Sequence, residues 1–176
     1  IHASSLGEIN LLDSFIQKLQ EDKSKNIIIS VVTDTGYNQA LLKYKSSNVR
    51  IVYFPLDNYF AIRKLFSRVT IEKTIIVETE LWPNLINYAH KNSKLYLING
   101  RITEKSFKKY FRVRHYLKSF LNKFEYLIMQ TEEDKGRIIK LGAKVDKVYN
   151  FGNLKFDIKF DNYSDEELLN FKEKLG

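Results

Sequence analysis

Short apolar runs alternate with amphipathic stretches along most of the chain. Runs of four to seven residues, rich in Val, Ile and Tyr, indicate strands buried on both faces of a sheet. Apolar residues spaced three and four positions apart indicate helices with one buried face. The predicted strands cover residues 27–33, 49–54, 74–78, 95–98, 126–130 and 147–151. The predicted helices cover residues 7–22, 34–45, 58–68, 83–91, 103–123 and 132–142.

This alternation predicts an α/β fold, a Rossmann-like parallel sheet with helices on both faces. The apolar fragment at residues 1–3 indicates that the chain begins inside a strand, so we expect an excerpt of a longer protein. Near the other end, Ser164 and Glu167 form a capping box, which predicts a short helix to Gly176. That helix follows a polar stretch, residues 161–163, and we interpret it as a linker.

Composition narrows the classes of partner. With 176 residues, 44% of them hydrophobic, the chain suffices for one domain with a core. Its net charge of +8 favours nucleic acid, anionic lipid or phosphorylated substrates as partners. The absence of cysteine excludes a disulfide scaffold and a thiolate metal site. His2, His90 and His115 lack metal-ligand spacing, so we expect structural or surface roles for them.

The first candidate site is the stretch Ser4-Ser5-Leu6-Gly7-Glu8, between the opening fragment and the first predicted helix. Small residues and a glycine at a strand end let a ligand approach the backbone closely. Glu8 falls in the first helical turn, at the sheet edge where open α/β folds bind ligands. Two interpretations stay open: Ser5 and Glu8 form a capping box, or Glu8 is a general base. Spacing alone favours the capping box.

The second candidate is Glu78-Thr79-Glu80-Leu81-Trp82-Pro83-Asn84, which follows a predicted strand. Two carboxylates two positions apart, next to the only tryptophan, suggest a site, and a structural strand end stays equally open. Pro83 suits the first turn of the next helix. Strand alternation leaves open which of Glu78 and Glu80 faces the site.

Positive charge is concentrated between residues 101 and 125, with eight Lys and Arg against two Glu, or six of the eight net charges. Arg101, Lys105, Lys108 and Arg112 belong to this segment. One apolar helix stripe is expected to consist of Tyr110, Val113, Leu117, Phe120 and Phe124. The ordinary interpretation is a helix packed on the sheet with a solvated basic face. The charge density also indicates a surface for phosphates or an anionic membrane.

Common nucleotide and hydrolase signatures are missing from the sequence. No G-x-G-x-x-G follows a predicted strand, which disfavours a Rossmann nucleotide site, and there is no P-loop or Ser/His/Asp pattern. Residues 152–157 (GNLKFD) indicate a turn after the last strand.

Together these stretches resemble the 3-deoxy-D-manno-oct-2-ulosonic acid (Kdo) transferases of lipopolysaccharide synthesis. The resemblance spans nearly the whole chain, with its motifs in the family's order. The matching pieces are HASSLGE at 2–8, ETELWPN at 78–84, NGRITEKSFKKY at 99–110, QTEEDKGRIIKLGA at 130–143 and GNLKFD at 152–157.

The resemblance implies the N-terminal, acceptor-binding half of a two-domain (GT-B) inverting glycosyltransferase. Residues 1–160 then form a Rossmann-like domain with its first strand truncated, and residues 161–176 form a linker helix towards a donor domain absent from this chain. The implied reaction moves Kdo from CMP-Kdo to a lipid A precursor without a metal or other cofactor. The implied place is the cytoplasmic face of the bacterial inner membrane, peripheral or anchored by an upstream segment.

The resemblance also assigns roles to residues. It implies Glu8 as the catalytic base, supported by Glu80 or, second, Glu78. The acceptor side is expected to include Ser4, Ser5, Gly7, Trp82, Arg101, Lys105, Lys108 and Arg112. A domain junction on the donor side is expected at Asn153, Lys155 and Asp157. Two alternatives remain: a GT-B enzyme with another lipid acceptor, and a non-catalytic basic α/β module that binds RNA or anionic membrane, although the resemblance implies no nucleic-acid partner.

Overall fold

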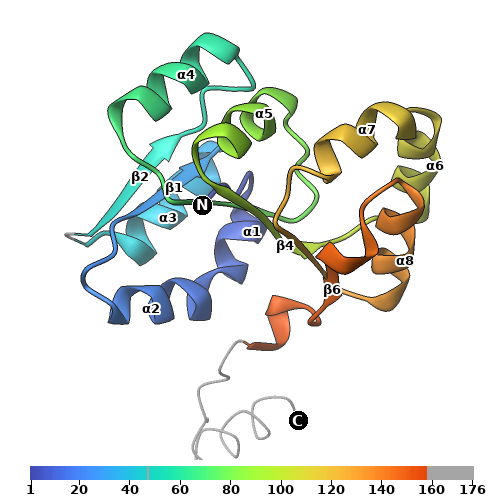
Figure 1. The fold of residues 1–176 in the computed structure, drawn as a ribbon. Coiled ribbons are helices and arrows are strands. Elements are labelled where there is room, and N and C mark those ends of the chain that lie inside the picture. Colours follow the sequence, from blue (N-terminus) through green and yellow to red (C-terminus); the bar gives the residue numbers. More distant parts are fainter. Residues whose placement is uncertain (47, 158–176) are drawn as a thin grey trace, which may run out of the picture.

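The computed structural model describes residues 1–46 and 48–157 and has the predicted α/β fold, with parallel strands flanked by helices (Figure 1). The strands are β1 (Ile27–Val31), β2 (Val49–Tyr53), β3 (Lys73–Val77), β4 (Lys94–Gly100), β5 (Tyr126–Met129) and β6 (Val148–Asn150). The helices are α1 (Leu6–Leu11), α2 (Asp13–Glu21), α3 (Asp34–Tyr44), α4 (Tyr59–Arg68), α5 (Pro83–Asn92), α6 (Glu104–Arg112), α7 (Arg114–Leu121) and α8 (Glu132–Lys140). Two short 3₁₀ turns, η1 (Val145–Lys147) and η2 (Leu154–Asp157), flank β6.

The opening fragment joins two groups of strands into one sheet. β1 pairs with β2, and β3, β4, β5 and β6 pair in that order, all in parallel. Residues 1–3 lie between β1 and β3: Ser30 N–H donates to the Ile1 carbonyl at 2.9 Å, and Val77 N–H donates to the His2 carbonyl at 2.9 Å. The carboxyl ends of all these strands therefore meet at one edge of the sheet.

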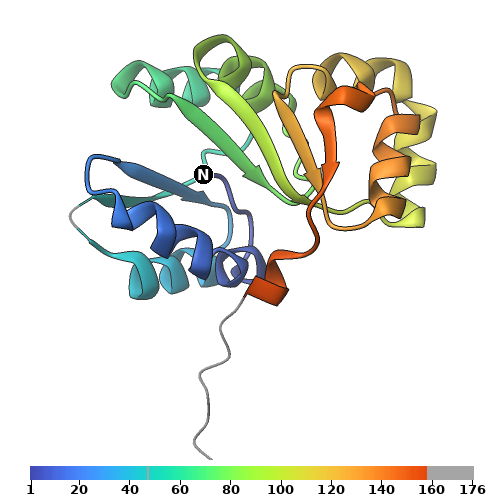
Figure 2. The same ribbon diagram turned by 60° about the horizontal axis from the view of Figure 1, so that its bottom comes forward.

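Each face of the sheet buries its own apolar cluster. One cluster packs residues of α1, α2 and α3 against β1, around Ile9, Ile16 and Ile29. The other packs α4, α5, α7 and α8 against the strands from β3 onward, around Ile76 and Leu97. Figure 2 shows helices on both sides of the twisted sheet. β1 is buried at four of its five positions, as expected for a strand covered on both faces, whereas β4 and β5 alternate between buried and more exposed positions.

The predicted helix 7–22 is wrong as a single element, because the chain forms α1 and α2 with a break at Leu12. The Tyr44 hydroxyl donates to the Ile9 carbonyl at 2.7 Å and to the Asp13 carboxylate. The Leu12 N–H also donates a hydrogen bond to the Ile9 carbonyl, at 3.2 Å. In a continuous helix the Ile9 carbonyl would accept the Asp13 N–H. Because the Tyr44 hydroxyl binds this carbonyl instead, the first helix ends and α2 begins at Asp13.

The predicted helix 103–123 is likewise two helices, α6 and α7, separated at Val113. Val113 is 51% exposed, whereas Leu117 and Phe120 are buried, so the expected single apolar stripe is interrupted. Tyr110 and Phe107 pack against the core from α6. The basic segment therefore presents two short amphipathic helices.

The caps expected from the sequence are present. Thr33 and Thr131 accept N–H groups of Gly36 and Asp134 with their side chains, and Pro83 opens α5. β1 ends two residues earlier than expected, because Val32 and Thr33 donate their N–H groups to the Ser4 carbonyl at 3.3 and 3.2 Å. The predicted linker helix from Ser164, and the boundary near residue 160, lie outside the described residues.

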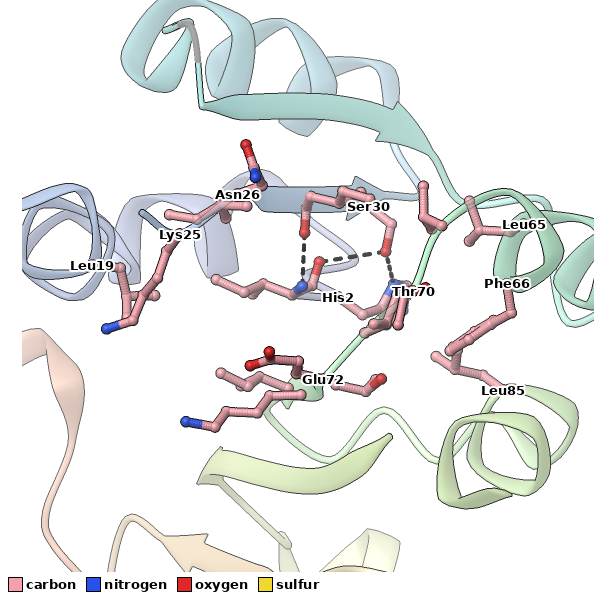
Figure 3. Close-up of a pocket in the computed structure, with 18 of the residues that line it drawn as sticks. His2, Leu19, Lys25, Asn26, Ser30, Leu65, Phe66, Thr70, Glu72 and Leu85 are labelled. Carbon is pink, nitrogen blue, oxygen red and sulfur yellow. Dashed lines mark hydrogen bonds between the residues drawn. The ribbon is translucent and has the colours of Figure 1, made fainter. Parts of the chain in front are cut away.

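A cavity of about 760 Å³ opens at the amino edge of the sheet, where β1 and β3 begin (Figure 3). Leu19, Asn26, Phe66 and Glu72 are among its lining residues. It contains none of the carboxylates of the two candidate motifs. The carboxylates of the candidate site lie outside this cavity, at the opposite edge of the sheet, where the strands have their carboxyl ends.

Candidate functional site

Glu8 is a buried carboxylate held by the loop before it. Its Oε2 accepts the Ser4 N–H at 2.7 Å, its Oε1 accepts the Ser5 hydroxyl at 3.0 Å, and only 5% of the residue is exposed. Its own N–H donates to Ser5 Oγ at 3.4 Å, so Ser5 caps α1, and the return bond from the carboxylate goes to the Ser4 N–H, one residue before the position that a standard capping box uses. The cap therefore fixes the carboxylate at the edge of the sheet.

A second layer, which sequence reasoning missed, holds Ser4. His2 Nε2 lies 3.3 Å from Ser4 Oγ, and His2 Nδ1 lies 3.0 Å from Ser30 Oγ. Burial lowers the pKa of His2 to about 3, so this imidazole is neutral and structural, as expected of it. Its spacing from Ser4 was the only signal in the sequence, because strand alternation puts both side chains on one face.

The surroundings of Gly7 do not require a glycine, although the sequence suggested a close backbone approach there. It lies in α1, and a Cβ there would meet only Ser5 Oγ, at 3.8 Å. Gly36, near the same loop, is close-packed, since a Cβ there would lie 2.8 Å from Val31 Cγ1 and 3.1 Å from Leu6 N. That approach lets α3 pack against the start of α1, and so supports the loop that holds Glu8.

The pKa of the Glu8 carboxyl group is raised to near neutral pH. Burial raises its pKa from 4.5 to about 7, against the two hydrogen bonds from Ser4 and Ser5, which favour the ionised form. The charges of Glu80 and Glu78 raise the pKa further. Both carboxylates of the second motif therefore lie near enough to Glu8 to act on its charge.

Glu78 directly follows β3 and adopts a left-handed backbone, with φ of 57°. Burial raises its pKa, while the positive charges of Arg101 and Lys155 act in the opposite direction. Burial also raises the pKa of Tyr110, with a contribution from Glu80, which places this α6 side chain beside the site. Sequence reasoning assigned Tyr110 only to the apolar stripe.

Trp82 packs inward from the N-terminus of α5. Its ring lies 5.5 Å from that of Phe54 and 6.4 Å from that of His2, between ring centres. Its indole Nε1 is buried without a hydrogen-bond partner among the described residues. Trp82 therefore packs beside His2, and its indole N–H is a donor without a hydrogen-bond partner among the described residues.

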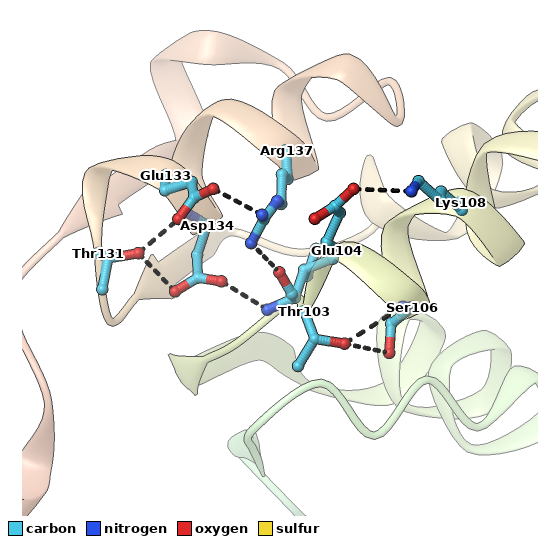
Figure 4. A network of polar contacts seen from close by, with 9 residues as sticks. Thr103, Glu104, Ser106, Lys108, Thr131, Glu133, Asp134 and Arg137 are labelled. Carbon is cyan, nitrogen blue, oxygen red and sulfur yellow. Dashed lines mark hydrogen bonds and ion pairs between the residues drawn. The ribbon is translucent and has the colours of Figure 1, made fainter.

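Helix α8 clamps the loop that carries Arg101 (Figure 4). The buried Asp134 accepts the Ile102 N–H at 2.7 Å and the Thr131 hydroxyl at 2.6 Å. Arg137 donates to the Ile102 carbonyl at 2.7 Å. Thr79 exchanges hydrogen bonds with the Arg101 backbone from the other side. The Arg101 backbone is thereby fixed, while its side chain is exposed.

The basic residues of α6 form an exposed face. Lys105, Lys108 and Arg112 are spaced as one helix side and are all exposed. Lys108 pairs with Glu104 at 2.7 Å, an exposed ion pair of small energy. Lys105 and Arg112 form no ion pair with described residues.

The turn after β6 is tied back to the sheet. Asn153 Nδ2 donates to Gln130 Oε1 at 3.1 Å, and Leu154 N–H donates to Asn99 Oδ1 at 3.1 Å. Lys155 is exposed nearby, and the backbone of Asp157 ends η2. No group of three or more His, Asp or Glu suited to a metal ion occurs within residues 1–46 and 48–157.

These features define a Rossmann-like α/β domain with a carboxylate cluster at the carboxyl edge of a parallel sheet. The chain belongs to the 3-deoxy-D-manno-octulosonic-acid transferase (kdotransferase) family, whose N-terminal glycosyltransferase region matches residues 1–158. This confirms the family that the motifs indicated.

Curated relatives match the chain over nearly its whole length. It is 44% identical to a bifunctional glycosyltransferase/methyltransferase of Fusobacterium nucleatum, over 100% of this chain and 28% of the relative. It is 31% identical to a 3-deoxy-D-manno-octulosonic acid transferase of Rickettsia typhi, over 100% of this chain and 36% of the relative. It is 30% identical to a 3-deoxy-D-manno-octulosonic acid transferase of Haemophilus influenzae, over 96% of this chain and 39% of the relative. The chain thus spans between about a quarter and two fifths of these relatives.

Proposed function

We propose that this chain is the acceptor-binding half of an inverting Kdo transferase and that Glu8 is its catalytic base. The observation that carries the proposal is the Glu8 carboxylate, buried and oriented by Ser4 and Ser5, with its pKa raised to about 7. A base with a pKa near the working pH combines sufficient ionisation with sufficient basicity. An exposed glutamate would be ionised but a weaker base.

In the proposed reaction, a hydroxyl of the lipid A precursor attacks the anomeric carbon of Kdo in CMP-Kdo. The Glu8 carboxylate takes the hydroxyl proton, the bond from the anomeric carbon to the CMP phosphate breaks, and CMP leaves with the bonding electrons. Attack from the side opposite CMP inverts the configuration. Burial keeps the pKa of Glu8 high, and the charges of Glu80 and Glu78 add to the rise, which strengthens Glu8 as a base.

The acceptor is proposed to lie along Ser4, Ser5, Gly7 and Trp82, with its phosphates towards the positive side chains. Arg101 lies next to Glu78, and the exposed face of α6 supplies Lys105, Lys108 and Arg112. The same positive charges favour binding to an anionic membrane surface, which we propose is the cytoplasmic face of the inner membrane. Within the described residues no helix combines the length and apolarity needed to cross a bilayer.

CMP-Kdo is proposed to bind mainly to a further domain of the full-length protein, with the turn at Asn153, Lys155 and Asp157 at the junction. We propose no metal and no organic cofactor, because proton transfer by Glu8 and departure of CMP account for the reaction. The side chains of Asn153 and Lys155 lie at the same sheet edge as Glu78, which supports a junction there.

The decisive experiment replaces Glu8 in the full-length protein. Glu8→Gln keeps the shape and can still accept from Ser4, but it cannot take a proton. We expect Kdo transfer from CMP-Kdo to a lipid A precursor to fall by about 10² to 10⁴-fold. Glu125→Gln, an exposed glutamate in the same chain, is the matched control and should retain full activity. Near-normal transfer by correctly folded Glu8→Gln protein would refute the base assignment.

Another lipid acceptor is the second candidate, since the Fusobacterium relative is described by a broader glycosyltransferase name. A screen of sugar donors and lipid acceptors with the full-length protein separates the two enzymes. A non-catalytic module would instead bind RNA or anionic vesicles without any transfer. RNA binding would weaken steeply with salt, in proportion to the phosphates contacted.

A further inference from the structure

Two neighbouring strands end on strained residues at the candidate site. Asn99, near the end of β4, has φ of 53°, and Glu78, just after β3, has φ of 57°. The preceding residues, Ile98 and Val77, are register partners, so the two left-handed residues lie side by side. Non-glycine residues adopt this backbone at a cost, and Asn tolerates it better than most. Backbone strain of this kind clusters at functional sites, so its occurrence at adjacent positions supports a functional role for this edge.

Asn99 is also the anchor of a distant segment. It is 2% exposed, and its Oδ1 accepts the N–H of Leu154, which is 55 positions away in sequence. Its main-chain carbonyl accepts Gln130 Nε2 at 3.0 Å, and Gln130 Oε1 in turn accepts Asn153 Nδ2. Two links therefore run from Asn99 to the turn that follows β6. Its Nδ2 is buried without a partner among the described residues.

The anchored turn carries a charge that acts on the carboxylate cluster. Lys155 follows Leu154 directly, and its N–H donates to Asn153 Oδ1 at 3.0 Å. The charges that bear on Glu78 are Arg101 and Lys155, which oppose the effect of burial, and Glu80, which adds to it. Glu8 couples to Glu78 and Glu80 in turn. The position of Lys155 thus bears on Glu78, and Glu78 in turn bears on Glu8.

We propose that Asn99 is a positioning residue for the transfer reaction: it fixes the turn at residues 152–155 to the end of β4 and so holds Lys155 at the edge of the sheet where Glu78 lies. This inference rests on the proposed function. The side chain suits the task, because Gly would accept the backbone but offer no acceptor to Leu154. Asp would offer the acceptor but add another carboxylate next to Glu78.

The test uses four variants of the full-length protein: Asn99→Gly, Lys155→Met, the double variant, and Asn92→Gly. Asn92 is exposed at the end of α5 and supplies the matched control. We expect Asn99→Gly to lower kcat/KM by about tenfold to a hundredfold. The acid limb of its pH profile should move to higher pH, because a carboxylate cluster that loses a nearby cation holds its protons more tightly. Lys155→Met should show the same shift.

The double variant decides whether Asn99 acts through Lys155. If it does, the double variant is no slower than the slower single variant. Losses that multiply, or an unmoved acid limb in folded Asn99→Gly protein, would overturn the inference. Should Asn99→Gly fail to fold, Gln130→Met releases Asn153 from the same tether and should shift the limb in the same direction.

A measurement without turnover separates this inference from the proposed function. Hydrogen exchange at the Leu154 amide should become faster in Asn99→Gly and stay unchanged in Asn92→Gly, whatever reaction the protein performs. Unchanged protection in Asn99→Gly contradicts the tether itself. Active Glu8→Gln protein, by contrast, contradicts the proposed function and leaves the exchange result standing.

Discussion

At the scale of single residues, Glu8 shows opposing effects on one carboxyl group. Ser4 and Ser5 donate hydrogen bonds that favour the ionised form, whereas burial and two nearby carboxylates favour the protonated form. Burial is the largest of these, so the pKa rises to about 7. The capping box and the base are therefore compatible: the cap orients the group, and burial makes it basic.

The same balance predicts how stability depends on pH. Because the pKa of Glu8 rises from 4.5 to about 7 on folding, its contribution to stability is fully present below pH 4.5 and is lost as the pH rises through 7. Glu8→Gln removes this loss, and its amide can still bond Ser4 and Ser5. We expect the variant to gain stability relative to the parent protein by up to about 3 kcal/mol at pH 8.

Urea unfolding at pH 5 and pH 8 measures this difference, with Glu125→Gln as the exposed control. The gain of Glu8→Gln should be small at pH 5 and grow towards pH 8. A gain that is equal at both pH values would show that the carboxyl group of Glu8 is not the titrating group.

At the scale of elements, periodicity predicted the order and kind of nearly every helix and strand in the described residues. It missed the breaks at Leu12 and Val113, because a single-residue interruption preserves the apolar spacing on either side. The break at Leu12 depends on the Tyr44 hydroxyl, which reaches the Ile9 carbonyl from another helix. Contacts of this kind have no local signature.

The candidate site shows the same division. Carboxylates at strand ends were visible in the sequence, because polar residues interrupt apolar runs there. The contacts of His2 and Asn99 were not visible in the sequence, because they depend on which strands lie side by side and on the burial of the two side chains. The acids of the candidate site were therefore predictable from the sequence, whereas the groups that orient them became apparent only in the fold.

The clamp from α8 yields a prediction at this scale. Asp134→Ala removes the acceptor of the buried Ile102 N–H and the partner of the Thr131 hydroxyl. Loss of a buried charged acceptor should destabilise the protein by about 2–3 kcal/mol. Glu133→Ala, on the same helix, breaks only an ion pair whose glutamate is exposed and should cost less than about 0.5 kcal/mol. Equal midpoints of thermal unfolding for the two variants would contradict the clamp.

At the scale of the whole molecule, one sheet edge collects the functional groups from segments spread along the chain. Glu8 follows the opening strand, Glu78 and Glu80 follow β3, Arg101 follows β4, and Lys155 follows β6. Parallel strands produce this convergence, because every strand delivers its carboxyl end to the same side. The amino edge carries a separate cavity that contains none of these residues.

Because the sequence has no motif for a nucleotide, we expect the 176-residue chain alone to bind acceptor without transferring Kdo. The proposed base, the two neighbouring carboxylates and the basic face all belong to this chain. The purified chain and the full-length protein should be assayed side by side with CMP-Kdo and lipid A precursor vesicles. The chain should sediment with the vesicles, less so at high salt, and release no CMP in excess of a no-protein control. Multiple turnovers by the folded chain would show that the donor site lies within these residues, and the proposed division between acceptor and donor halves would then be wrong.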